Sequence, residues 1–146
     1  MHARIGIALA LGFALAACQS AQKATPASDS TATASASVKE VTVTEVASYI
    51  QNKSATVFDA NNAETREKMG VVPGAVLLTN SHDYSLSQLP AAKDSKLVFY
   101  CGGTMCRASD SAAKRAAQAG YADVSVMRAG IKGWRDAGQT TETPRS

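Results

Sequence analysis

Histidine is scarce in this chain of 146 residues, and its scarcity argues against a zinc site. Of the two histidines, His2 lies in a stretch that we expect to be removed, which leaves His82. Cys101 and Cys106 are far from His82 in the sequence, and two cysteines with one distant histidine give poor ligand spacing for zinc. We therefore expect no metal site, and we place His82 in a surface loop.

The sequence also lacks a basic stripe with interleaved aromatic residues, and it lacks internal repeats. These absences argue against a nucleic-acid-binding protein and against a solenoid fold. The 15 Lys and Arg residues nearly balance the 12 Asp and Glu residues. Loss of Arg4 with residues 1–17 would leave 14 basic and 12 acidic residues, a net charge of +2, which indicates no polyanionic partner.

No apolar run is long enough to cross a membrane. The run at 5–17 is shorter than the roughly 20 residues of a spanning helix, but it follows Arg4 as the core of an export signal does. Leu15-Ala16-Ala17-Cys18 resembles the bacterial lipoprotein box, in which the cysteine is lipidated and becomes the first residue after cleavage. The resemblance implies a signal peptide at 1–17 and a lipid anchor on Cys18. An ordinary signal peptide is the alternative.

Such an anchor predicts a location. Two or more acyl chains, such as palmitate, hold a protein stably on a membrane, whereas one chain binds only marginally. Gln19 follows Cys18, and by resemblance to enterobacterial sorting a residue other than aspartate favours the outer membrane. We expect a protein of the bacterial cell envelope that faces the periplasm, a compartment in which disulfides persist.

The composition divides the mature chain into a tether and one domain. Residues 19–37 contain no large apolar residue, and 14 of these 19 residues are Ala, Ser or Thr, so no core can form there. We interpret residues 18–37 as the lipidated cysteine and a flexible tether with a span of roughly 25 Å. Residues 38–141 are expected to fold as one domain, a monomer, and 142–146 to form a disordered tail.

Within the domain, short apolar runs alternate with helical patterns. The runs at 56–60, 75–78 and 97–100 are nearly continuous, as is typical of a parallel sheet that is covered on both faces. Further strands are expected at 41–43 and 124–127, and helices at 44–51, 63–69, 108–119 and 131–137. The pattern predicts an α/β fold, with an open parallel sheet flanked by helices on both faces.

One cysteine lies where a strand, a loop and a helix meet. The apolar strand ends at Cys101, and an alanine-rich helix is expected from residue 108. A helix N-terminus stabilises an anion and lowers the pKa of a cysteine thiol from about 8.5 to roughly 3.5–7.5, so Cys101 is the candidate nucleophile. The candidate substrate-binding loop consists of Gly102, Gly103, Thr104, Met105, Cys106 and Arg107.

Two acidic residues are expected near this thiol. Asp59 ends another apolar strand, so it is expected at the same sheet edge as Cys101, either as a supporting residue or as a loop or helix cap. Asp110 lies in the first turn of the expected helix and would oppose a thiolate if it pointed at the sulfur. The simpler interpretation of Cys101 is an inert buried thiol, or half of a structural disulfide with Cys106.

Four motifs in order resemble the rhodanese domain over nearly all of residues 38–141. They are Phe58-Asp59-Ala60, Pro73-Gly74-Ala75, Tyr100-Cys101 and the segment from Met127 to Gly138, which is similar to the family's Gly-Gly-Ile-x-x-Trp-x-x-Ala-Gly ending. The resemblance implies that Cys101 takes a sulfane sulfur from a small donor such as thiosulfate and holds it as a persulfide. It would then pass the sulfur to a thiol or to a cyanide-like acceptor, with no metal or organic cofactor.

Two positions depart from the family's pattern and keep alternatives open. Cys106 stands where an arginine usually ends the loop, and Asn61 stands where a second arginine is usual, so positive charge is lost beside the sulfur. Counted as Cys-x5-Arg, Cys101 to Arg107 has the spacing of rhodanese-fold phosphatases and arsenate reductases. A disulfide between Cys101 and Cys106 would instead make a thiol redox or binding module.

Overall fold

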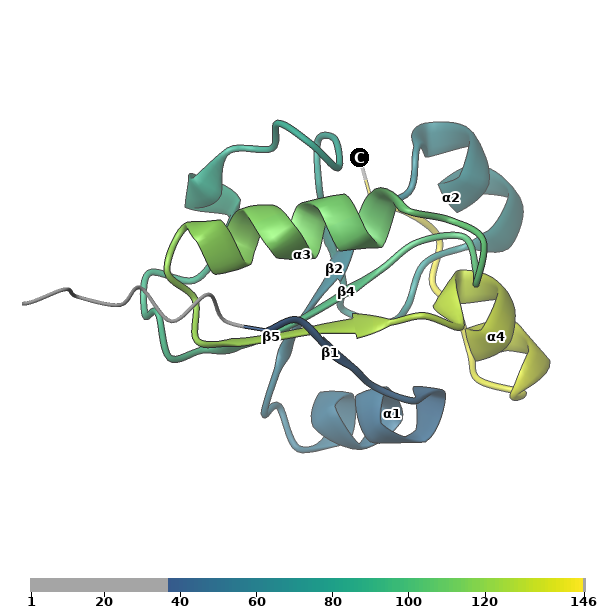
Figure 1. Cartoon of the computed structure of the whole chain (residues 1–146). Helices are drawn as coiled ribbons and strands as arrows, with labels where there is room; N and C mark the ends of the chain where they lie inside the picture. The colour runs from purple at the N-terminus through teal and green to yellow at the C-terminus, as the bar shows by residue number, and fades with distance from the viewer. Residues whose placement is uncertain (1–36, 146) are drawn as a thin grey trace, which may run out of the picture. The chain divides into compact units, whose positions relative to one another are not determined.

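The computed structural model describes residues 37–145 (Figure 1). The predicted signal peptide at 1–17, the predicted lipidation site Cys18 and the predicted tether up to residue 36 lie outside the described residues. Within the described range, no helix has both the length and the apolar character needed to cross a bilayer.

Five parallel strands form one sheet in the order β1-β5-β4-β2-β3. The strands are β1 (Lys39–Glu40), β2 (Thr56–Asp59), β3 (Val76–Leu77), β4 (Lys96–Tyr100) and β5 (Asp123–Met127). The helices are α1 (Val43–Gln51), α2 (Ala63–Met69), α3 (Ala108–Gln118) and α4 (Gly130–Asp136), with a 3-10 turn η1 (Leu86–Gln88). Helix α3 covers one face of the sheet and α1 the other (Figure 1), which confirms the predicted α/β fold.

The first strand lies before its predicted position at 41–43, because Thr42 belongs to the following helix. The Thr42 hydroxyl accepts a hydrogen bond from the Glu45 N–H (3.2 Å), and the Thr42 N–H donates to Glu45 Oε2 (2.7 Å). This reciprocal capping box fixes the start of α1. The Val41 N–H still donates to the carbonyl of Val126 (3.0 Å), so the chain leaves the sheet only at the cap.

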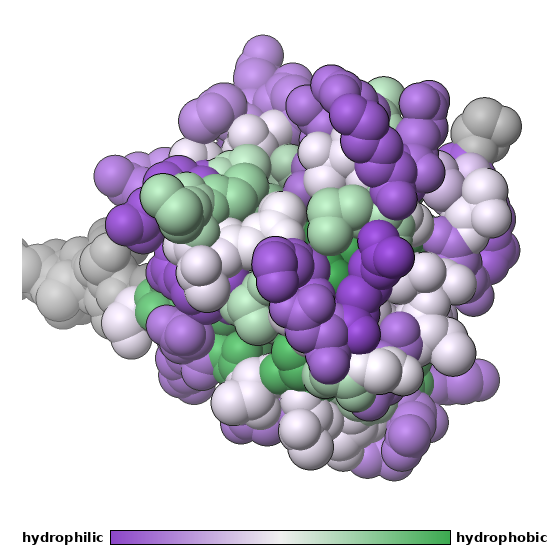
Figure 2. All heavy atoms as spheres, turned by 90° about the vertical axis from the view of Figure 1, so that its right-hand side faces the viewer, coloured by the Kyte–Doolittle hydropathy of each residue, from purple (hydrophilic) through white to green (hydrophobic). Residues whose placement is uncertain are grey.

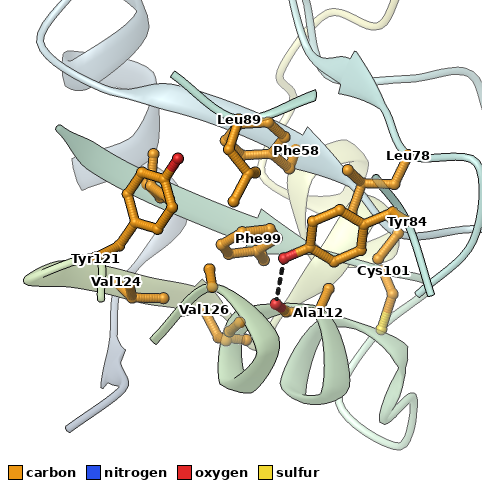
Figure 3. Close-up of a cluster of buried hydrophobic side chains, with 14 residues drawn as sticks. Phe58, Leu78, Tyr84, Leu89, Phe99, Cys101, Ala112, Tyr121, Val124 and Val126 are labelled. Atoms are coloured by element: carbon orange, nitrogen blue, oxygen red, sulfur yellow. Dashed lines mark hydrogen bonds between the residues drawn. The ribbon is translucent and has the colours of Figure 1, made fainter. Parts of the chain in front are cut away.

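Side chains of the central strand β4 alternate between two buried clusters. The α3-side cluster contains Phe58, Ala60, Leu78, Tyr84, Leu89, Leu97, Phe99, Cys101, Ala112, Ala113, Ala116, Tyr121, Val124 and Val126. The α1-side cluster contains Val41, Val46, Val57, Val72, Val98, Tyr100, Met127, Ile131 and Trp134. Because successive strand residues face opposite sides, Tyr100 and Cys101 point into different clusters. Figure 3 shows Cys101 at one end of the α3-side cluster, beyond the stacked rings of Phe58 and Phe99.

Small side chains let α3 lie close to the sheet. Its buried face consists of Ser109, Ala112, Ala113 and Ala116, at the spacing of one helical stripe. Tyr84 donates its hydroxyl to the carbonyl of Ala112 (2.8 Å; Figure 3), and burial raises the pKa of Tyr84 to about 12. Ser109, in the first turn of α3, lies beside Cys101, which begins the loop after β4.

The chain beyond residue 141 contributes to the domain. Glu142, which the sequence prediction places in the tail, forms an antiparallel bridge with Val71 through two backbone hydrogen bonds of 2.9 Å. Its carboxylate accepts a hydrogen bond from the Gly74 N–H (3.3 Å), and this bond lowers the pKa of Glu142. The ordered domain therefore includes Glu142.

Candidate active site

Cys101 lies at the carboxyl end of the central strand, between the ends of β2 and β5. It is 1% exposed, and its Sγ lies 3.3 Å from the hydroxyl of Ser109, a buried residue in the first turn of α3. Ligands of open parallel sheets bind at this edge. Figure 2 shows the face at the right of Figure 1, where hydrophilic side chains predominate and hydrophobic ones appear in small patches between them.

A disulfide joins Cys101 to Cys106 across the loop, with the two Cα atoms 6.2 Å apart. The structure therefore contains the disulfide that the sequence left as one of several alternatives for Cys101. Because the Cys101 sulfur carries no hydrogen in this state, Ser109 is the donor in their hydrogen bond.

Helix α4 fixes the start of the loop through two backbone hydrogen bonds. The Ile131 N–H donates to the carbonyl of Cys101 (2.8 Å), and the Lys132 N–H donates to that of Gly102 (3.0 Å). Gly130 makes this approach possible: it has a φ of +62°, and a Cβ there would lie 2.4 Å from the Cys101 carbonyl oxygen and 2.6 Å from the Gly103 nitrogen. The glycine-rich ending of the domain thus fixes the position of Cys101.

Several loop N–H groups remain available to a ligand. The Cys106 N–H donates to the Gly103 carbonyl (2.9 Å), which closes a turn. Among the described residues, no group accepts a hydrogen bond from the N–H groups of residues 102–105. Such a loop before the N-terminus of a helix is suited to an anion at Cys101.

Arg107, the positively charged residue of the loop, pairs with Asp110 in α3. The Arg107 side chain is 77% exposed, and its Nη1 lies 3.2 Å from Asp110 Oδ2, which also binds Arg128 Nη1 at 2.6 Å. Partial burial raises the pKa of Asp110, but hydrogen bonds from Arg128 and Arg107 outweigh burial and bring that pKa below its ordinary value. Asp110 is thus bound to arginines, and the arginine of the Cys-x5-Arg spacing does not close over the loop.

Asp59 lies at the predicted edge of the sheet, but its carboxylate forms its contacts on the face opposite the Cys101 side chain. Its Oδ2 accepts a hydrogen bond from the Tyr100 hydroxyl, and its Oδ1 accepts from the Asn61 N–H (2.6 Å) and pairs with Arg66 Nε (3.2 Å). The strand register explains this: Asp59 is paired with Tyr100, whose side chain belongs to the α1-side cluster. The contacts of Asp59 support the backbone around the site rather than the sulfur of Cys101.

A cavity of about 320 Å³ opens beside the loop, and Cys106 lines it. The other lining residues are Ala60, Asn61, Asn62, Thr65, Thr79, Asn80, Ser81 and Ala108, which are uncharged. Asn61 is 8% exposed, and its Nδ2 has no hydrogen-bond partner among the described residues. We name this space the Cys106 cavity.

The structure brings together most of the predicted site and adds residues that the sequence did not single out. Cys101 and residues 102–107 form one loop, whereas Asp59 faces away and Cys18 lies outside the described residues. Ser109 and Gly130 are the additions, and the glycine-containing motif after β5 was the available signal for Gly130. No group of three His, Cys, Asp or Glu residues in the described range is arranged to hold a metal ion.

The geometry agrees with a known family. The family model described as a rhodanese-like domain matches residues 42–137, which contain the whole loop and all four helices. A search of the curated proteins found no match.

Solved structures share the fold. A Rhodopseudomonas palustris protein described as a possible tyrosine phosphatase is 24% identical, with a TM-score of 0.60 over 72% of this chain and 85% of that chain. The human single-domain sulfurtransferase TSTD1 is 18% identical, with a TM-score of 0.55 over 68% and 97% of the two chains. The rhodanese-like domain of an Anabaena protein is also 18% identical, with a TM-score of 0.57 over 74% and 81%.

Proposed function

The chain belongs to the rhodanese-like domain family, and on that premise we propose that it is a sulfurtransferase whose Cys101 carries a sulfane sulfur as a persulfide. One observation carries the proposal: Cys101 directly follows the central strand β4, and it lies beside the Ser109 hydroxyl in the first turn of α3 and beside a loop whose N–H groups at 102–105 have no acceptor among the described residues. Each of these features favours a negatively charged sulfur over a neutral one.

The transfer takes place in two displacements. The Cys101 thiolate attacks the outer sulfur of thiosulfate, the S–S bond of thiosulfate breaks, and sulfite leaves with the electron pair. A thiol or cyanide then attacks the terminal sulfur of the persulfide and takes it, and the Cys101 thiolate is restored. The loop N–H groups and Ser109 stabilise the charged sulfur at both steps.

The disulfide sets a condition for this activity and supports a second candidate function. While Cys101 is bonded to Cys106 it cannot attack a donor, so the cycle starts only after reduction. A protein that exchanges this disulfide with other thiols, without carrying sulfane sulfur, would be a thiol redox module. The two functions differ in whether reduced Cys101 gains a sulfur atom.

The test uses the full-length chain in a Cys18→Ser background, so that Cys101 and Cys106 are the two thiols. The protein is reduced, freed of reductant and given thiosulfate, and its intact mass is measured before and after cyanide is added. We expect a gain of one sulfur atom, released as thiocyanate, in the parent chain and in Cys106→Ser but not in Cys101→Ser. Absence of the adduct from every reduced form would contradict sulfur transfer from thiosulfate and favour the redox module.

We further propose that the domain is tethered to the outer membrane, facing the periplasm, through a lipid on Cys18. The apolar run that ends in Leu15-Ala16-Ala17-Cys18 supports this location. Metabolic labelling with a palmitate analogue in a bacterial host should mark the wild-type chain and leave Cys18→Ser unlabelled. Fractionation of the two membranes then tests the outer-membrane assignment, and an unlabelled wild-type chain would contradict the anchor.

A further inference from the structure

The two sulfurs of the disulfide differ in their access to solvent. Cys101 is 1% exposed and belongs to the α3-side cluster, whereas Cys106 is partly buried and lines the Cys106 cavity. A thiolate that opens a disulfide must reach one of the two sulfurs. Of the two cysteines, Cys106 is the one that a thiolate in the cavity meets.

The leaving sulfur is the one with the stabilising surroundings. Attack at Cys106 releases Cys101 as a thiolate, 3.3 Å from the Ser109 hydroxyl and at the N-terminus of α3. Attack at Cys101 would release Cys106, whose sulfur, unlike that of Cys101, forms no hydrogen bond with a side chain among the described residues. A better-stabilised leaving thiolate speeds disulfide exchange. Accessibility and leaving-group stability therefore both favour attack at Cys106.

The lining of the Cys106 cavity selects an uncharged ligand. None of its lining residues is charged, and the nearby Arg66 and Arg107 are paired with Asp59 and Asp110. A carboxylate or sulfonate entering this cavity would lose its hydration without meeting a free cation among the lining residues. At about 320 Å³ the space is at the small end of ligand pockets, enough for a short side chain with its neighbouring amides.

Asn61 lines the cavity and has a buried amide nitrogen with an unmet hydrogen bond. The residue is more than nine-tenths buried, and its Nδ2 lacks an acceptor among the described residues. A Cβ placed on Gly102 would lie 3.8 Å from Asn61 Oδ1 and 4.0 Å from Cys106 Cβ, so the amide and the reactive cysteine flank the same point of the loop. A ligand carbonyl that displaced the atoms covering Asn61 Nδ2 would accept a hydrogen bond from it while the ligand's thiol reached Cys106.

We propose that the Cys106 cavity binds a cysteine thiol flanked by uncharged amides, as in a polypeptide, and that this thiol opens the disulfide at Cys106. The incoming thiolate forms a bond to Cys106 Sγ, the bond between Cys106 and Cys101 breaks, and the electron pair leaves on Cys101. A second thiol of the same class then attacks the mixed disulfide, becomes oxidised to a disulfide with the first, and leaves Cys106 as a thiol. This inference rests on the proposed function, because the thiolate released is the one that accepts sulfur.

The first experiment identifies the sulfur that is attacked. The oxidised full-length chain with Cys18→Ser is mixed with N-acetylcysteine amide, quenched with N-ethylmaleimide and mapped by mass spectrometry. We expect the mixed disulfide on Cys106 and the maleimide on Cys101. The reverse pattern would overturn the inference.

The second experiment tests the ligand class with matched thiols. Opening rates with N-acetylcysteine amide, N-acetylcysteine and 2-mercaptoethanol are each divided by that thiol's rate with a small disulfide in solution, so that intrinsic reactivity cancels. We expect the neutral amide to be fastest, and Asn61→Leu to slow it about five- to tenfold, the effect of one hydrogen bond, while 2-mercaptoethanol changes little. Asn61→Arg should reverse the preference in favour of the carboxylate-bearing N-acetylcysteine.

Matched controls distinguish this inference from a general loss of structure. They also let it be tested independently of the proposed function. Asn52→Leu makes the same exchange at an exposed position that caps α1, and it should leave all three rates unchanged. A blocked Ala-Cys-Ala peptide, run beside N-acetylcysteine amide, shows by a higher rate whether a polypeptide is preferred to a small thiol. Equal normalised rates for all thiols would overturn the inference. Sulfur uptake from thiosulfate by the pre-reduced chain is scored separately, so either idea can fail without the other.

Discussion

The hydroxyl of Tyr100 donates to the buried carboxylate of Asp59 and accepts a hydrogen bond from the Val72 N–H at 3.0 Å. One side chain thus joins the end of β4 to the end of β2 and to the segment before β3, on the face opposite the thiol. Burial first, and then the charge of Asp59, raise the pKa of Tyr100 well above its ordinary value, so the hydroxyl keeps its proton and remains a donor.

Removing this hydroxyl should destabilise the domain without changing its chemistry. Tyr100→Phe leaves the Asp59 carboxylate and the Val72 N–H each short of a partner, and we expect unfolding to cost about 1–3 kcal/mol less in urea denaturation. Tyr84→Phe is the matched control, since it removes a buried hydroxyl that serves one helix carbonyl. Folded Tyr100→Phe should still take up sulfur on Cys101. A cost no larger than that of the control would contradict the joining role of Tyr100.

The ion pair between Arg66 and the carboxylate of Asp59 gives a second stability prediction. Arg66 is 13% exposed at its side chain, pairs with Asp59 and donates to the carbonyls of Asp59 and Leu78. Arg66→Met should cost about 3 kcal/mol or more, because it leaves a buried carboxylate without its counter-charge, and adding Asp59→Asn should recover part of the loss. Lys68→Met, on the same helix α2, breaks an exposed pair with Glu64 and should cost at most about 0.5 kcal/mol.

Gly130 should prove essential for the position of the nucleophile. An alanine there would have an unfavourable φ and would also place its Cβ against the backbone of Cys101 and Gly103. Gly120→Ala is the control, because its φ of +91° carries the same conformational cost of about 1 kcal/mol while its Cβ meets no atom within 4 Å. We expect Gly130→Ala to lose more stability than the control and to lose most of its sulfur uptake. Equal behaviour of the two variants would contradict the packing argument.

Ser109 should affect the reactivity of the reduced thiol. Its hydroxyl lies 3.3 Å from Cys101 Sγ, so a Cys101 thiolate would accept a hydrogen bond from it. Ser109→Ala should slow alkylation of Cys101 by iodoacetamide at neutral pH by roughly three- to tenfold. Ser111→Ala, in the same turn, loses a hydroxyl that bonds the Arg107 carbonyl and should react at the parent rate. A Ser109→Ala variant that reacts as fast as the parent would remove this hydroxyl from the mechanism.

The hydrogen bonds of Asp110 predict how the free energy of unfolding changes at acid pH. Its pKa lies below the ordinary value of 3.8, because hydrogen bonds from Arg128 and Arg107 outweigh its partial burial. A carboxyl whose pKa is lower in the folded state stabilises the protein above the unfolded pKa, and this contribution disappears as the pH falls through the folded pKa. Asp110→Asn should therefore lose at most about 1 kcal/mol near pH 6, and its difference from the parent should shrink as the pH falls below the ordinary pKa of 3.8. Asp94→Asn, on an exposed turn, is the control in urea denaturation across this pH range.

Local sequence signals carried the prediction of most elements. The apolar runs that end at Asp59 and Tyr100, and the alanine stripe of α3, are properties of neighbouring residues. Apart from the first strand, the predicted strands and helices form close to their predicted positions. The first strand was misplaced because the capping box of Thr42 and Glu45 competes with strand pairing, and a short strand at the sheet edge has few ladder bonds to oppose it.

The sequence by itself determined the α/β fold and the meeting of strand, loop and helix at Cys101, because these depend on periodicity and on spacing along the chain. Only the tertiary structure decided which groups serve the thiol. It turned Asp59 to the opposite face through the pairing of Asp59 with Tyr100, brought Gly130 against the loop, and placed Cys106 rather than Cys101 beside the cavity. Each of these outcomes depends on the direction of side chains between segments far apart in the sequence, which the register of the sheet and the packing of the helices set.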